Sequence, residues 1–248
     1  VLSFTTMNIT TSSPLASGSV GTAYSVQLAG VGGTSTSSWS AGTGLPSGVT
    51  LSSTGLLSGT PTTAGSYAFT VTMTNNGQIT TKDFTLVVNA TVTFNSNYSG
   101  GPTSTTQTGY GSLSLTANSF TRNGYTFQGW AATSGGSVAY TDGQSYSFAT
   151  NQTLWAVWAA TSITVTTSAA TTVTDAGAVL NGSISANGTT TAATFCYNST
   201  GSQTGGVLSS CTSVTATPSS ATGSGSTAIS YSIASGLAAG TTYSFQAV

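Results

Sequence analysis

The 248-residue chain has almost no charge. It contains two basic and three acidic side chains, no histidine and no glutamate, and its formal net charge is −1. The five charged residues are Lys82, Arg122, Asp83, Asp142 and Asp175. Nucleic acid binding needs a basic surface, which two cations cannot make. Because repulsion between copies is weak at so low a net charge, self-association is easier than usual.

The same scarcity excludes the common catalytic and metal sites. A Ser–His–Asp or Cys–His site needs an imidazole base, and zinc would have only two cysteines and no histidine as ligands. A glycosidase needs two carboxylates within about 10 Å of each other. The three aspartates lie in separate segments, and Asp142, before Gly143, and Asp175 have the setting of turn residues. We therefore expect no enzyme activity, no metal and no cofactor.

Long apolar runs are missing too. No stretch of about 18 apolar residues is present, so the sequence predicts no membrane-spanning segment. No signal peptide is visible, and Val1 is not a natural start. We expect the chain to be a processed form or a window of something longer.

Cysteine is limited to Cys196 and Cys211. A disulfide between them would close a loop of about 15 residues, a spacing that suits neighbouring β-strands. The alternative is two buried free thiols. The polar flanking residues favour the disulfide, which would place the chain in an oxidising, extracellular setting.

Short segments of alternating apolar and polar residues dominate what remains. Gly, Ser and Thr separate these segments, and helical periodicity is absent. Such a pattern predicts an all-β protein. Examples are Tyr24-x-Val26-x-Leu28, Tyr67-x-Phe69-x-Val71-x-Met73 and Phe84-x-Leu86-x-Val88.

Residues 7–90 carry the segment LPSGVTLSSTGLLSGTPTTAGSYAFTVT. This segment closely resembles the immunoglobulin-like (Ig-like) module found in tandem on bacterial surface proteins. The resemblance implies a β-sandwich in which these residues are structural. Some cadherin-like relatives bind calcium through acidic clusters. The corresponding loop here, residues 74–77, has no carboxylate, so we expect no calcium site.

Residues 91–160 hold most of the tryptophan and contain FTRNGYTFQGW, followed later by TLWAVW. These motifs are similar to the B-repeat of the Listeria internalins, also called the Listeria–Bacteroides repeat. The resemblance implies a small β-grasp-like domain that serves as a spacer or a self-associating unit in adhesins.

Residues 161–248 resemble the fibronectin type III-like modules of secreted bacterial proteins up to their sixth strand. The segment Leu-Ala-Ala-Gly-Thr-Thr-Tyr at 237–243 carries the resemblance, which implies that Tyr243 makes a tyrosine corner. The last strand of such a module is missing here. Residues 1–6, Val-Leu-Ser-Phe-Thr-Thr, look like that strand, so we assign them to a neighbouring module of the same kind. Leu2 and Phe4 would then fill an uncovered strip beside Tyr243, Phe245 and Ala247.

Two further residues admit a chemical interpretation. Trp155 has the opposite parity to its apolar neighbours and could stack on a sugar ring, although a contact between modules is the commoner role of such a residue. Lys82 shares the inward parity of Phe84 and could form a Lys–Asn crosslink. Without a glutamate to assist that reaction, a lysine that reaches toward solvent is favoured.

These features together predict a structural or adhesive, extracellular multi-module protein. We expect it to be a repeat unit of a bacterial surface stalk or fibre that contacts itself head-to-tail through strand complementation, with cell-surface or matrix ligands as further candidate partners. The alternative is a carbohydrate-binding accessory region of a secreted enzyme.

Overall fold

The computed structural model describes residues 6–33 and 35–248. All of its regular elements are β-strands, which confirms the all-β prediction. No helix in the described part of the chain is long and apolar enough to cross a membrane. The chain divides into two compact units. The first holds the described residues of 6–120 and 128–157, and the second holds 121–127 and 158–248.

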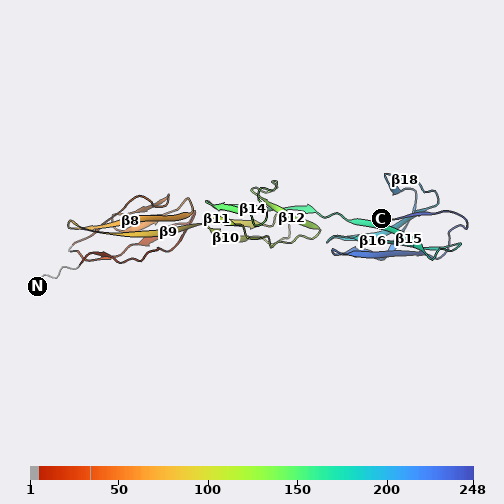
Figure 1. Ribbon diagram of the computed structural model, residues 1–248, viewed down its shortest axis with the longest axis horizontal. Helices are drawn as coiled ribbons and strands as arrows, with labels where there is room; N and C mark the ends of the chain where they lie inside the picture. The colour runs from red at the N-terminus through yellow and green to blue at the C-terminus, as the bar shows by residue number, and fades with distance from the viewer. Residues whose placement is uncertain (1–5, 34) are drawn as a thin grey trace. The chain divides into compact units, whose positions relative to one another are not determined.

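The Ig-like module lies in the first unit and is built around the hairpin of β8 and β9 (Figure 1). Asn76 and Gly77, both with positive φ, form its two-residue turn. The strands are β1 (Asn8–Ile9), β2 (Gly18–Ser19), β3 (Tyr24–Gln27), β4 (Gly30–Val31), β5 (Ser38–Ala41), β6 (Val49–Leu51), β7 (Leu56–Gly59), β8 (Gly65–Asn75) and β9 (Gln78–Asn95). A separate sheet of β3, β7 and β6 packs into the same core. Leu57 enters this core from β7, Phe69 from β8 and Phe84 from β9.

Strand β9 is 18 residues long and crosses the predicted boundary between residues 90 and 91. Its alternate side chains are buried from Phe84 to Phe94 without interruption, so one row of apolar residues enters the cores of both modules. The other strands of the repeat module are β10 (Thr105–Gly109), β11 (Gly111–Ser114), β12 (Tyr125–Ala131), β13 (Ser145–Phe148) and β14 (Gln152–Ala160). Trp130 is buried in this core. The centre of its ring lies 4.8 Å from that of Phe94 and 6.1 Å from that of Phe120.

The second unit contains one six-stranded sheet in the order β15-β16-β21-β20-β17-β22 and a small hairpin of β18 and β19. Their bounds are β15 (Thr164–Thr171), β16 (Ala178–Ser185), β17 (Thr190–Asn198), β18 (Gln203–Thr204), β19 (Val207–Leu208), β20 (Thr212–Thr222), β21 (Ser226–Ile233) and β22 (Ser244–Ala247). The sheet curls around a core that includes Leu180, Ile184 and Phe195. Its two end strands, β15 and β22, lie close to each other: the Ala247 N–H donates to the Thr167 hydroxyl at 3.0 Å.

Candidate functional site

The outer edge of β22 is open. Val248 and Thr194 exchange two backbone hydrogen bonds, of 2.9 and 3.1 Å. Hydrogen-bonded pairs alternate along an antiparallel ladder, so the backbone groups of Gln246 and Ser244 also face β17. The groups of Phe245 and Ala247 therefore face away from β17. The Ala247 N–H is bound to the side chain of Thr167. No described residue pairs with the N–H or C=O of Phe245.

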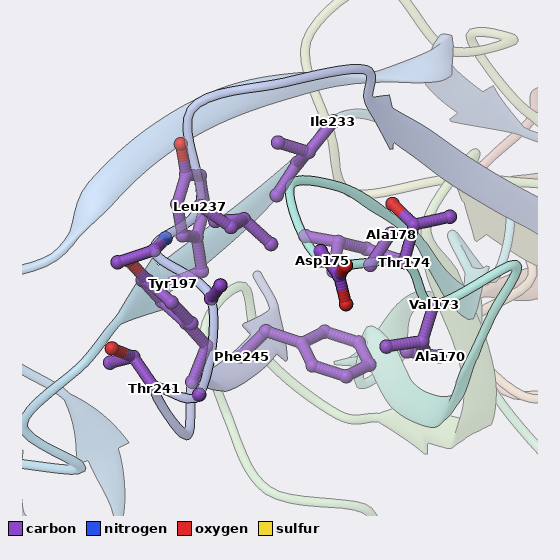
Figure 2. A pocket seen from close by; sticks show the side chains of 15 residues that line it. Ala170, Val173, Thr174, Asp175, Ala178, Tyr197, Ile233, Leu237, Thr241 and Phe245 are labelled. Atoms are coloured by element: carbon purple, nitrogen blue, oxygen red, sulfur yellow. The ribbon is translucent and has the colours of Figure 1, made fainter.

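A pocket of about 300 Å³ lies beside this open edge (Figure 2). Figure 2 shows Phe245 on one side of it, with its ring directed toward Ala170 and Val173. Asp175 is the one charged residue in its wall, which otherwise consists of apolar, hydroxyl and backbone groups. The lining residues are Ala170, Val173, Thr174, Asp175, Ala178, Leu180, Tyr197, Ile233, Leu237, Ala238, Ala239, Gly240, Thr241, Tyr243 and Phe245.

Aromatic contacts fix the wall of the pocket that β22 and β17 form. The ring of Phe245 lies 6.2 Å from that of Phe195, and the ring of Tyr243 lies 6.5 Å from that of Tyr197. The Tyr243 hydroxyl accepts a hydrogen bond of 3.1 Å from the Ala238 N–H. This bond back to the preceding loop is the tyrosine corner that the resemblance implied.

Strand β15 borders the same groove from the other side. Val165 and Thr167 lie on the same face of β15, because alternate side chains of a strand point the same way. Thr167 contacts Ala247, so Val165 is also directed toward the space between β15 and β22. Val165 is 38% exposed, and Val173, just after the strand, is 71% exposed. We define the acceptor groove as the pocket together with this strip between β15 and β22. Two valine side chains along this groove are thus open to solvent.

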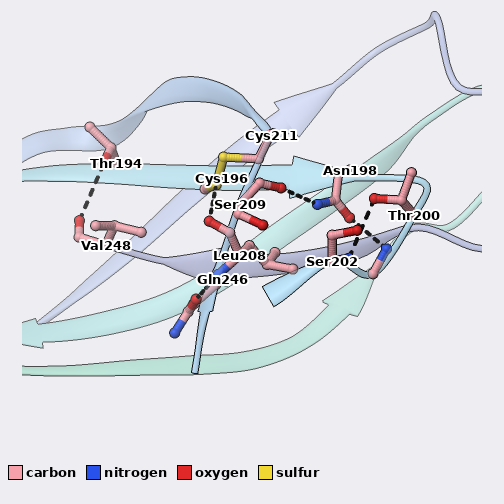
Figure 3. The surroundings of a disulfide bond; sticks show 11 residues. Thr194, Cys196, Asn198, Thr200, Ser202, Leu208, Ser209, Cys211, Gln246 and Val248 are labelled. Carbon is pink, nitrogen blue, oxygen red and sulfur yellow. Dashed lines mark hydrogen bonds between the residues drawn. A yellow bond between two sulfur atoms is a disulfide. The ribbon is translucent and has the colours of Figure 1, made fainter. Parts of the chain in front are cut away.

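Figure 3 shows the surroundings of the disulfide. Cys196 precedes Tyr197, which lines the pocket, so its side chain lies on the opposite face of β17. Cys196 and Cys211 are bonded, with their Cα atoms 5.5 Å apart, as the sequence predicted. The loop that it closes folds over the sheet, where Leu208 is buried and its N–H donates to the Gln246 side chain at 3.0 Å. Cys196 is also buried, with 6% of its surface exposed. The bridge thus supports the outer face of β17 and β22.

The structure brings three of the predicted complementation residues together. Tyr243 and Phe245 line the pocket, and Ala247 lies in the same strand with its side chain buried. Leu2 and Phe4 lie outside the described residues. Val165, Thr167 and Val173 were not predicted as part of this site, although Ile163 and Val165 alternate as apolar residues of one strand face do.

The two residues with chemical alternatives lie in the first unit. Trp155 is half-buried on β14, between Leu154 and Ala156, which are fully buried. The Lys82 ammonium donates to the backbone carbonyls of Thr11 at 2.6 Å and Ile9 at 3.3 Å. These bonds hold the start of the Ig-like module against β9, and the Lys82 side chain is half-buried.

Two of the aspartates accept hydrogen bonds from neighbouring residues. Asp83 accepts a hydrogen bond of 2.6 Å from the Thr70 hydroxyl, and Asp142 accepts one of 2.8 Å from the Asn118 N–H. Within the described residues, no group of three or more His, Cys, Asp or Glu side chains could hold a metal ion.

Comparison with known families assigns two of the modules. Residues 6–91 match the family described as "Putative Ig domain", and residues 91–157 match the Listeria-Bacteroides repeat domain. The predicted Ig-like and repeat modules are thus confirmed, whereas the fibronectin type III-like identity of residues 161–248 stays a prediction. Domains of these two kinds are typically non-catalytic. Together with the disulfide, they indicate an extracellular surface or accessory module.

Two solved structures are similar to part of the chain. A "putative alpha-galactosidase" from Bacteroides fragilis NCTC 9343 is 25% identical, with a TM-score of 0.30, and the match covers 33% of this chain and 17% of that one. A "putative alpha-galactosidase/melibiase" from the same organism is 19% identical, with a TM-score of 0.28 and coverage of 36% and 20%. The chain thus matches a fifth or less of either protein. The comparison with curated proteins gave no match.

Proposed function

We propose that the chain is a structural repeat of an extracellular stalk or fibre, whose third module is completed by a β-strand from a neighbouring repeat. The observation that carries the proposal is the unpaired backbone edge of Phe245 beside an apolar groove. An open edge pairs readily with an added strand, and side-chain pockets beside it select the sequence of that strand.

The strand we assign to the groove has the sequence of residues 1–6, taken from another repeat. Leu2 and Phe4 stand at alternate positions, so both side chains would enter the groove while the residues between them face solvent. A contact between the start of one copy and the end of the next is heterologous. It therefore propagates into a fibre instead of closing as a dimer.

Sedimentation of the full chain tests this contact. We expect polymers whose length grows with concentration, and we expect a Phe4→Ser chain to stay monomeric. A peptide with the sequence of residues 1–6, added to the Phe4→Ser chain, should bind and should protect the Phe245 N–H from hydrogen exchange. The same peptide with serine in place of Leu2 and Phe4 is the control. A wild-type chain that stays monomeric, with no protection of Phe245 by the peptide, would overturn the proposal.

The mass of the native protein under denaturing conditions distinguishes two sources of the strand. A mass near 24.4 kDa supports donation between separate chains, and a much larger mass supports tandem repeats in one chain. We favour the tandem chain, because fibronectin type III-like modules carry such a strand within their own sequence.

The carbohydrate-binding alternative depends on Trp155. Because this side chain is half-buried, it offers a sugar only part of its ring surface. A glycan array separates the two functions, since a structural repeat should show no saturable sugar binding.

A further inference from the structure

Strands β2 and β14 lie one after the other along the same edge of β9. Three residues of β9 show this by their backbone hydrogen bonds. Thr85 binds residues that precede β2, and Asn89 binds the residue that follows it. Thr91 binds the residue that precedes β14. The other edge of β9 pairs with β8 and then with β10, both antiparallel. Both β2 and β14, in contrast, are parallel to β9.

The parallel pairing in the Ig-like module extends beyond β2 itself. The Leu15 N–H donates to the Thr85 carbonyl at 2.9 Å, and the Val20 N–H donates to the Asn89 carbonyl at 2.9 Å. Residues 15–20 thus run beside residues 85–89, and the register shifts by one residue between these two bonds. In the repeat module, β14 pairs with β9 from Gln152, opposite Val92, to Trp155, opposite Asn95.

Each parallel pair joins an early strand of a module to its last strand. Residues 15–20 precede most of the Ig-like module and β9 ends it, whereas β9 begins the repeat module and β14 ends it. When tension pulls on the two ends of such a module, its early strand is drawn backward and its last strand forward. Two parallel neighbours must then slide lengthwise, and all the hydrogen bonds between them carry the load together. A hairpin pulled open at one end, in contrast, loses its bonds one after another.

Asn151 connects the two parallel pairs. Its side-chain amide donates to the Val20 carbonyl at 3.0 Å and accepts from the Thr91 N–H at 2.8 Å. Nearby, the Ala64 N–H donates to the Ala149 carbonyl at 2.8 Å. These bonds lie between the end of β2 and the start of β14, where the edge of β9 would otherwise be unpaired.

We propose that β2, β9 and β14 form a double shear clamp, which gives the first unit a load-bearing function under tension along the chain. The load passes from one module to the next through the uninterrupted backbone of β9, so no flexible linker lies between the two clamps. This inference does not depend on the acceptor groove of the second unit, and a chain whose groove takes no strand would still show it.

Single-molecule stretching of the full chain tests the clamp through the direction of pulling. We expect the first unit to unfold at a force several times higher when the chain is held by its two ends than when it is held by its N-terminus and an Ile79→Cys handle. Ile79 is 67% exposed and lies at the end of β9 that is nearest to the start of the module. Pulling there opens the Ig-like clamp from one end. Equal forces in the two directions would overturn the proposal.

A matched pair of variants tests Asn151. At a fixed force applied to the chain ends, Asn151→Ala should unfold the first unit about tenfold faster, because two load-bearing hydrogen bonds are lost. Asn118→Ala is the control. The Asn118 side chain also makes one donated and one accepted bond, both to Phe120, but lies outside the clamp. If the two variants have the same unfolding rate at that force, Asn151 has no role in the clamp.

Discussion

The Tyr243 hydroxyl accepts a hydrogen bond of 3.1 Å from the backbone N–H of Ala238. This bond closes the loop that precedes β22, because Tyr243 is the residue just before that strand. Both residues line the acceptor groove. The shape of the groove therefore depends on a contact within one short segment of the chain.

Removing the Tyr243 hydroxyl should loosen this segment. We expect Tyr243→Phe to lower the free energy of unfolding of the second unit by about 1 kcal/mol, the usual net contribution of one hydrogen bond. Denaturant titration measures the loss. Tyr231→Phe is the control, because Tyr231 packs against the same core and its hydroxyl has no hydrogen bond within the described structure. Equal losses in the two variants would show that the corner adds nothing.

The disulfide should stabilise the second unit alone. Closing a loop of about 15 residues contributes about 3 kcal/mol by restricting the unfolded chain, and this loop lies wholly within that unit. Labelling of the unfolded, unreduced protein should find no free thiol. After reduction, hydrogen exchange should accelerate in β17 and β22 and stay unchanged in β8. Two labelled cysteines before reduction would contradict the prediction.

Alkaline pH should destabilise the first unit. Burial raises the pKa of Tyr24 above its usual 10.0, and burial followed by the nearby Tyr140 raises that of Tyr146. A raised pKa means that the folded state holds these protons more tightly than the unfolded state. The stability is therefore fully present below pH 10 and falls as pH rises through the folded pKa values.

Thermal unfolding between pH 8 and 11.5, followed by hydrogen exchange in the Ig-like and repeat strands, measures this loss. Tyr146→Phe should flatten part of the pH dependence, because it removes the titrating proton and keeps the half-buried ring in contact with Tyr140 and Phe148. A stability that is constant across this range would contradict the prediction.

Local patterns were enough to predict several features of this fold. Alternation indicated β8 and the first half of β9, spacing and flanking residues indicated the bond between Cys196 and Cys211, and the resemblance of residues 237–243 indicated the tyrosine corner. Each of these features depends on residues that lie close together in the chain, or on a short motif whose residues form a turn. The open edge of β22 was also expected from the sequence.

The missed features depend on contacts between distant residues. The sequence alternates from Phe84 to Phe94 without a break, but only pairing with β10 and β14 shows that this is one strand. Asn151 binds residues 60 and 131 positions away, and its local sequence is that of an ordinary polar turn. The contact between Thr167 and Ala247 requires the whole six-stranded sheet to curl, which no local pattern encodes.

The continuity of β9 should make the Ig-like and repeat modules unfold together. Phe94 lies in the repeat module and is 2% exposed, so Phe94→Ala should cost about 3–5 kcal/mol. Because its strand continues through Phe84 in the Ig-like core, we expect hydrogen exchange to accelerate in β8 as well as in β14. Phe195→Ala, at a fully buried position of the second unit, should cost a similar amount without affecting β8. Faster exchange in β14 with unchanged protection of β8 would show that the two modules unfold independently despite their common strand.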